Sequence, residues 1–139
     1  MAARRRVLFL CTGNSCRSQM AEAIATGRLA DRWEASSAGT SPAAGVHPLA
    51  VQVLAEIGIT HRGRPKPADT FRDVPFDLVV TVCGHAHETC PAWLGGKARI
   101  VHVGFDDPPA LARNARTEEE ALSHYRRVRD EIRAFVETL

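Results

Sequence analysis

The stretch VLFLCTGNSCRS, residues 7–18, decides the fold of this chain. Its first four residues form an apolar run that is typical of a buried β-strand. Residues 19–29, which contain good helix formers such as Ala, Glu and Met, favour a helix. Cys11 therefore stands where a strand turns through a loop of Gly, Asn and Ser into a helix, and Arg17 follows it six residues later.

This loop has the composition of an anion-binding site. Successive backbone N–H groups in such a loop can point into one concavity at a helix N-terminus. Arg17 adds a planar fork of donors that suits a tetrahedral oxyanion. The same field stabilises the thiolate of Cys11, which makes it a candidate nucleophile for phosphate or a phosphate-like anion. We expect the anion loop to comprise Thr12, Gly13, Asn14, Ser15, Cys16, Arg17 and Ser18.

Composition narrows the class of protein. A chain of 139 residues, with 45% hydrophobic and 24% charged residues, predicts a single catalytic domain over residues 1–139. A net charge of +2 is too small to indicate nucleic-acid binding. We find no membrane span and no signal peptide, so we expect a cytoplasmic protein with no membrane partner. Thiols are kept reduced in that compartment, so the four cysteines favour catalysis, redox chemistry or metal binding over structural disulfides.

Apolar strands alternate with helical segments along the chain. We predict strands at residues 7–10, 33–38, 76–82 and 99–103, helices at 19–29 and 48–57, and a C-terminal helix whose capping box is Thr117 with Glu120. This alternation predicts an α/β, three-layer fold, with a four-stranded parallel sheet and helices on both faces. Ligands of such sheets bind beyond the carboxyl ends of the strands. We therefore expect residues 11–18, 83–90 and 106–108 to converge.

The segment CGHAHETCP, residues 83–91, holds two cysteines seven residues apart. On a regular helix Cys83 and Cys90 would lie roughly 10.5 Å apart along the axis. A disulfide needs Cα atoms within about 7 Å, so a bond between them requires the segment to loop out. Zinc binding by these cysteines with His85 and His87 is an alternative, but their spacing matches no common structural zinc site.

Asp107, followed by Pro108, is the candidate general acid for a departing oxygen. Asp106 is the second candidate, and a simple Asp-Pro turn is the alternative to both. For His102 and Cys16 we favour packing roles over catalytic ones.

With these residues in view, the chain resembles the thioredoxin-coupled arsenate reductases of the low-molecular-weight tyrosine-phosphatase superfamily. The resemblance spans nearly the whole chain, through residues 7–23, 37–39, 79–84, 90–91, 104–108 and 127–132. The first motif indicates only the superfamily. The pair Cys83 and Cys90 is what selects the reductases.

The resemblance implies a relay of three thiols that needs no cofactor. Cys11 attacks arsenate held by Arg17 and the loop, and Asp107 protonates the departing oxygen. Cys83 then attacks the Cys11 adduct, which releases arsenite, and Cys90 moves the disulfide to Cys83–Cys90. Thioredoxin reduces that disulfide, and phosphate or sulfate compete with arsenate.

Some relatives hold a potassium ion near the anion loop with residues that correspond to Asn14, Glu22 and Ser37 plus an aspartate. Lys66 stands at the aspartate position here, and its ammonium could replace the cation. We therefore predict no potassium and no other metal.

Two other functions remain as alternatives. A phosphotyrosine-protein phosphatase would use Cys11, Arg17 and Asp107 alone, although residues 109–111, PAL, lack the aromatic side chains that usually hold the phenyl ring. A metal- or arsenic-binding protein would use the cysteines and histidines of residues 83–90. A mycothiol- or glutaredoxin-coupled reductase is a variant of the first hypothesis, in which Cys90 would have no role.

Overall fold

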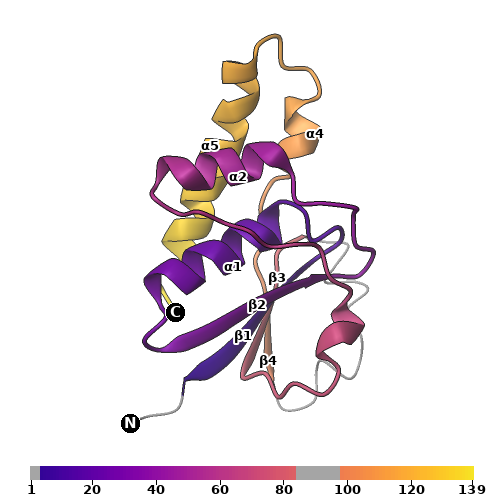
Figure 1. Cartoon of the computed structure of the whole chain (residues 1–139), viewed down its shortest axis with the longest axis vertical. Helices are drawn as coiled ribbons and strands as arrows, with labels where there is room; N and C mark the ends of the chain where they lie inside the picture. Colours follow the sequence, from indigo (N-terminus) through magenta and orange to yellow (C-terminus); the bar gives the residue numbers. More distant parts are fainter. Residues whose placement is uncertain (1–3, 84–97) are drawn as a thin grey trace.

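The computed structural model describes residues 4–83 and 98–139 (Figure 1). The described elements follow in the order β1 (Arg5–Cys11), α1 (Arg17–Arg28), β2 (Trp33–Gly39), α2 (Pro48–Glu56), the short 3₁₀ helix η1 (Ala68–Phe71), β3 (Leu78–Thr81), β4 (Arg99–His102), α4 (Pro108–Ala112) and α5 (Glu118–Val136).

The four strands form one parallel sheet in the order β2-β1-β3-β4. Strand β1 lies between β2 and β3, and its residues 7–10 are fully buried. A strand that is covered on both faces is apolar throughout, which explains the unbroken apolar run. In the register of the sheet, Cys11 lies opposite Gly39 and Leu10 lies opposite Thr81. The carboxyl ends of these strands therefore meet at one edge, where the anion loop begins.

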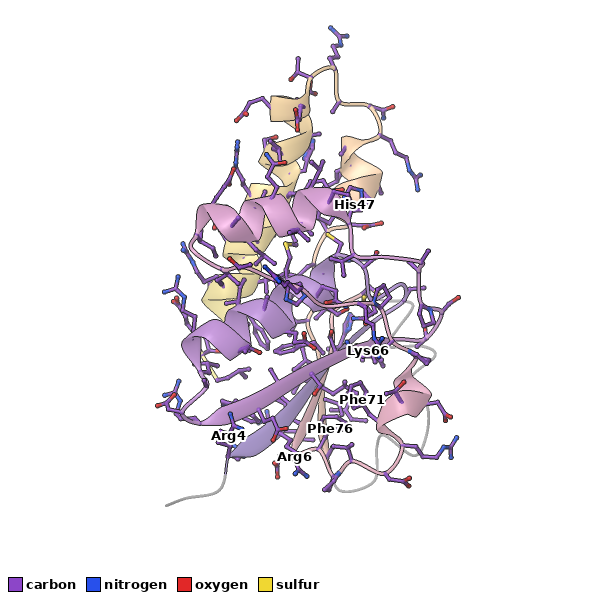
Figure 2. All side chains as sticks on the ribbon, in the orientation of Figure 1. Arg4, Arg6, His47, Lys66, Phe71 and Phe76 are labelled. Carbon is purple, nitrogen blue, oxygen red and sulfur yellow. The ribbon has the colours of Figure 1, made fainter. Side chains whose placement is uncertain are left out.

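Both faces of the sheet are covered, which confirms the predicted three-layer α/β fold. Helix α1 packs on β1 and β2, and α1, α2 and α5 lie together on one side of the sheet (Figure 1). Ser37 faces this layer, since its hydroxyl donates to the Glu22 carboxylate of α1 at 3.1 Å. On the other face, Ser36 borders the segment that carries η1, where the rings of Phe71 and Phe76 meet edge to face (Figure 2).

Helix α2 begins and ends as its sequence predicts. Pro48 occupies its first turn, where a missing N–H costs nothing, and His47 is the N-cap. Gly58, just beyond the helix, has a φ of +82°, the left-handed conformation that glycine adopts most easily.

The capping of α5 differs in part from the prediction. The Thr117 hydroxyl accepts from the Glu120 N–H at 3.0 Å, as a capping box requires. The Glu120 carboxylate, however, accepts from the N–H of Arg116 rather than from that of Thr117. The buried face of the helix comprises Leu122, Tyr125, Val128, Arg129, Ile132 and Val136.

Two short elements were not predicted. Helix η1 lies between α2 and β3, where the sequence predicts no element, and α4 starts directly at Pro108. Both are four or five residues long, too short to show a hydrophobic period. Within residues 4–83 and 98–139, no helix combines the length and the apolar character needed to cross a membrane.

Candidate active site

The loop between β1 and α1 is held from outside by the segment that follows β2. This segment, residues 40–47, is termed the collar. Its backbone N–H groups donate to four loop carbonyls: Thr40 to Cys11 at 3.1 Å, Ser41 to Thr12 at 2.9 Å, Ala43 to Gly13 at 2.9 Å and His47 to Ser15 at 2.8 Å. The Gln19 side-chain amide holds the carbonyl of Asn14 at 3.0 Å, and the Met20 N–H holds that of Cys16 at 2.9 Å.

These outward carbonyls orient the amides of the loop. Across a planar trans peptide, the C=O of one residue and the N–H of the next point in opposite directions. The N–H groups of residues 12–17 therefore face the inside of the loop. The N-terminus of α1 adds its own partial positive charge there, so the loop can bind a tetrahedral anion.

Asn14 shapes the centre of the loop. Its φ of +51° is left-handed, a strained conformation that costs of order 1–3 kcal/mol and that asparagine tolerates better than most residues. Three hydrogen bonds of its side chain offset that cost. The side chain donates to the Ser18 hydroxyl at 2.7 Å and accepts from the amide of Gln19 at 3.1 Å and from the Lys66 N–H at 2.9 Å.

Gly39 leaves room for this loop. A Cβ atom at position 39 would lie 2.5 Å from the carbonyl oxygen of Thr12 and 3.1 Å from the backbone nitrogen of Asn14. Only a residue without a side chain fits there while the loop keeps its shape.

The thiol of Cys11 lies at the base of the loop and is 3% exposed. The N–H of Asn14 donates to its sulfur at 3.1 Å, and the Ser18 hydroxyl lies 2.8 Å from it. The sulfur therefore lies at the N-terminus of α1, within hydrogen-bond distance of two polar groups. The arrangement can therefore supply a nucleophile that points into an oxyanion site.

Cys16, the second cysteine of the loop, has a different environment. It is buried within the hydrophobic core. Burial raises the pKa of its thiol far above the ordinary value, although the neighbouring Arg17 acts in the opposite direction. Cys16 thus remains a neutral packing residue, as its place in the sequence suggested.

Arg17 connects the loop to the segment after β4. Its guanidinium donates to the Phe105 carbonyl at 3.0 Å and lies 3.6 Å from the Asp107 carboxylate. Asp106 instead pairs with Arg127 of α5, at 3.0 Å. Of the two candidate acids, the structure places Asp107 beside the anion site and Asp106 away from it.

Cys83 lies directly beyond β3, against the anion loop. The N–H of Val82 still donates to the Leu10 carbonyl of β1, at 2.9 Å, so the chain stays beside β1 up to this point. Cys83 is a free cysteine and is 5% exposed. Its sulfur lies 3.3 Å from the Thr12 hydroxyl, within hydrogen-bond distance. A second buried thiol therefore borders the loop that holds Cys11.

The remaining predicted residues have mixed outcomes. Cys90, His85 and His87 lie outside the described residues, so their predicted roles stay predictions. His102 makes a hydrogen bond to the Thr81 hydroxyl at 2.9 Å, within the sheet. In the described part of the chain, no group of three or more His, Cys, Asp or Glu side chains is placed to hold a metal ion.

The ammonium of Lys66 occupies the position where the sequence suggested a built-in cation. It lies 3.9 Å from the Glu22 carboxylate and donates to the Arg64 carbonyl at 3.0 Å. Glu22 also accepts from Ser37, and the backbone N–H of Lys66 holds Asn14. Lys66 thus brings a positive charge and a loop contact to the same place (Figure 2).

Sequence reasoning missed two supports of the loop. Gln19 is fully buried, and besides Asn14 its amide group contacts Arg64 and His61. A polar residue in the first turn of a helix carries no signal for such a role. The collar was equally hidden, because it acts through backbone N–H groups that every residue except proline possesses.

Comparison with known proteins places the chain in a family. The sequence model described as "Low molecular weight phosphotyrosine protein phosphatase" matches residues 6–139, so the chain belongs to this family. Within it, the chain is 47% identical over 138 residues to the arsenate reductase of Halalkalibacterium halodurans, covering 97% of this chain and 94% of that protein.

Solved structures agree. An arsenate reductase in the phosphate-binding state superimposes with a TM-score of 0.79 at 30% identity, over 96% of this chain and 95% of that one. The thioredoxin-dependent arsenate reductase of Corynebacterium glutamicum gives a TM-score of 0.69 at 26% identity, over 99% of this chain and 62% of that one. These relatives are thus arsenate reductases, and the solved ones share the fold of this chain.

Proposed function

We propose that this protein reduces arsenate to arsenite through the three thiols of Cys11, Cys83 and Cys90, with thioredoxin as the final reductant. The observation that carries the proposal is the buried thiol of Cys83, whose sulfur lies 3.3 Å from the Thr12 hydroxyl of the anion loop. Phosphate-ester hydrolysis needs only one cysteine, whereas reduction needs a second thiol within reach of the first adduct.

The first step is nucleophilic attack by the Cys11 thiolate on arsenic. The loop N–H groups and Arg17 hold the oxyanion, and an arsenic–sulfur bond forms as one oxygen leaves. Asp107, 3.6 Å from the Arg17 guanidinium, donates the proton that this oxygen needs to depart as water. The adduct still contains pentavalent arsenic.

The second step transfers the electrons. The Cys83 thiolate attacks the sulfur of Cys11, so that a Cys11–Cys83 disulfide forms and the arsenic–sulfur bond breaks. The electron pair of that bond stays on arsenic, which leaves as trivalent arsenite. Two thiols have then lost two electrons together, and arsenic has gained two.

The third step regenerates the enzyme. Cys90 attacks Cys83, which frees Cys11 and leaves a Cys83–Cys90 disulfide for thioredoxin to reduce. The relay requires thiols that start reduced, so we place the protein in the cytoplasm. Phosphate and sulfate share the shape and charge of arsenate, and we expect both to compete for the loop.

Measuring the arsenite released per enzyme, with and without thioredoxin, tests the proposal. The wild-type protein should turn over repeatedly only with thioredoxin. Cys90→Ser should stop after one turnover as the Cys11–Cys83 disulfide, and Cys83→Ser should release no arsenite. Peptide mapping after one equivalent of arsenate identifies the trapped species. Repeated turnover by Cys90→Ser would exclude Cys90 from the relay.

Measuring the hydrolysis of p-nitrophenyl phosphate distinguishes an arsenate reductase from a phosphatase. Cys83→Ser should keep any such activity, because the anion loop is intact, whereas Cys11→Ser should lose both activities. Arg17→Ala should lose most of both. A protein that hydrolyses phosphate esters rapidly and releases no arsenite is a phosphatase, and near-normal arsenate reduction by Cys11→Ser would overturn the whole assignment.

A further inference from the structure

His47 joins the collar to the anion loop and to α2 at once. Its backbone N–H donates to the Ser15 carbonyl at 2.8 Å, the last of the four contacts between collar and loop. Its Nδ1 accepts from the N–H of Leu49 at 3.3 Å and so caps α2. Figure 2 shows His47 at the start of that helix.

The imidazole of His47 is in turn held by Tyr125 of α5. The Tyr125 hydroxyl lies 3.1 Å from Nε2 and 3.3 Å from Nδ1, and the ring centroids are 5.1 Å apart. Since Nδ1 accepts from Leu49, the neutral ring carries its proton on Nε2, which donates to the hydroxyl.

The position of the Tyr125 side chain is fixed because it is packed within the core. It is 1% exposed, and α5 packs against α1, α2 and α4. Burial raises the pKa of the Tyr125 hydroxyl above its ordinary value, with a smaller contribution from Asp107, so it stays a neutral hydroxyl. Burial lowers the pKa of His47, although the charge of Asp107 acts in the opposite direction.

The contact matters because the Ser15 carbonyl sets the direction of the next amide. If His47 shifts, the Ser15–Cys16 peptide is free to rotate, and the N–H of Cys16 turns away from the anion. The other three collar contacts lie at the opposite end of the loop and do not restrain this peptide.

We propose that His47 and Tyr125 form a positioning pair that fixes the Ser15 end of the anion loop and thereby sets its affinity for tetrahedral oxyanions. The proposal rests on the proposed function only in taking this loop as the substrate site. The pair does not touch the reacting atoms, so it acts on anion binding rather than on the chemical step.

Calorimetric titration with inorganic sulfate, together with KM and kcat for arsenate, tests the pair. Tyr125→Phe keeps the ring and removes the hydroxyl, and should raise both the sulfate Kd and the arsenate KM by about three- to tenfold, the range of one lost hydrogen bond. Its kcat should stay near the wild-type value, a division that a general loss of stability would not produce.

Two further variants make the test specific. Ser123→Ala removes another hydroxyl from α5, one that donates to the Glu120 carbonyl at 2.6 Å on the exposed side of the helix, and should leave the sulfate Kd unchanged. His47→Asn restores an N-cap acceptor for Leu49 but cannot reach Tyr125 in the same way, so its Kd should rise like that of Tyr125→Phe while its melting temperature falls less than that of His47→Ala.

The two proposals can fail separately. A sulfate Kd and an arsenate KM that are both unchanged in Tyr125→Phe would overturn the positioning pair, even if the wild-type protein reduces arsenate. Normal sulfate binding without arsenite release would overturn the proposed function and leave the pair standing, because sulfate titration requires no turnover.

Discussion

Replacing Gly39 with alanine should distort the anion loop without removing any side chain that contacts substrate. The new Cβ would lie 2.5 Å from the Thr12 carbonyl oxygen, about 0.9 Å inside the 3.4 Å at which ordinary contact begins. That oxygen cannot yield freely, because it accepts from the Ser41 N–H at 2.9 Å. Either the end of β2 or the loop must move by most of an ångström.

The size of the effect follows from this displacement. Overpacking of this kind costs about 1–3 kcal/mol of stability. A displacement near 1 Å at a reactive centre lowers the rate roughly 10²-fold. We therefore expect Gly39→Ala to fold, to melt several degrees lower, and to lose about two orders of magnitude in kcat/KM for arsenate.

Gly45→Ala is the matched control, since a Cβ there meets nothing within 4 Å. Both variants add one methyl group next to or within the collar, so any difference reports the contact with the loop. Thermal melting, sulfate titration and arsenite release on the two proteins complete the assay. Wild-type kcat/KM in Gly39→Ala would refute the reasoning, because the loop would then have tolerated a shift that the geometry says it cannot absorb.

Other predictions follow from single contacts. Asp107→Asn should lower kcat by about 10²–10⁴-fold with the fold intact, while Asp106→Asn, whose carboxylate faces Arg127, should stay within a few-fold of wild type; the reverse order would exchange the two roles. Burial lowers the pKa of both His47 and His61, so the unfolded chain binds more protons below about pH 6.5. Urea unfolding between pH 5 and 8 should therefore show that stability falls as the pH is lowered below about 6.5, and His47→Asn should flatten that slope. Lys66→Met leaves the Glu22 carboxylate without its cation and should cost about 1–3 kcal/mol in the same unfolding assay, whereas an unchanged midpoint would show that the ammonium is dispensable.

The strand, loop and helix around Cys11 could be predicted from sequence because each has a local signal. The apolar run of residues 7–10 marks a buried strand, and Pro48 and Gly58 mark the ends of α2. The cysteine and arginine of the loop carry their chemistry in their side chains. Local sequence therefore sufficed for the fold class and for the candidate nucleophile.

The supports of the loop could not be predicted because they depend on long-range contacts. The collar holds the loop through backbone N–H groups, which differ between residues only at proline. Tyr125 looks like any buried residue on the apolar face of α5, and its contact with His47 joins residues 78 positions apart. Gly39 has no left-handed φ, and the need for glycine there comes from the Thr12 carbonyl of the anion loop, which is distant in sequence.

The strand order explains how one loop can serve two chemistries. On one side of β1, strand β2 ends at Gly39 and continues as the collar, which gives the loop its shape. On the other side, β3 leads directly to Cys83, whose thiol reaches Thr12 of the loop. In the proposed mechanism, anion binding and nucleophilic attack depend on the first neighbour, and the transfer of electrons depends on the second. Removal of the Cys83 thiol should therefore leave the loop and its anion binding in place while arsenite release is lost.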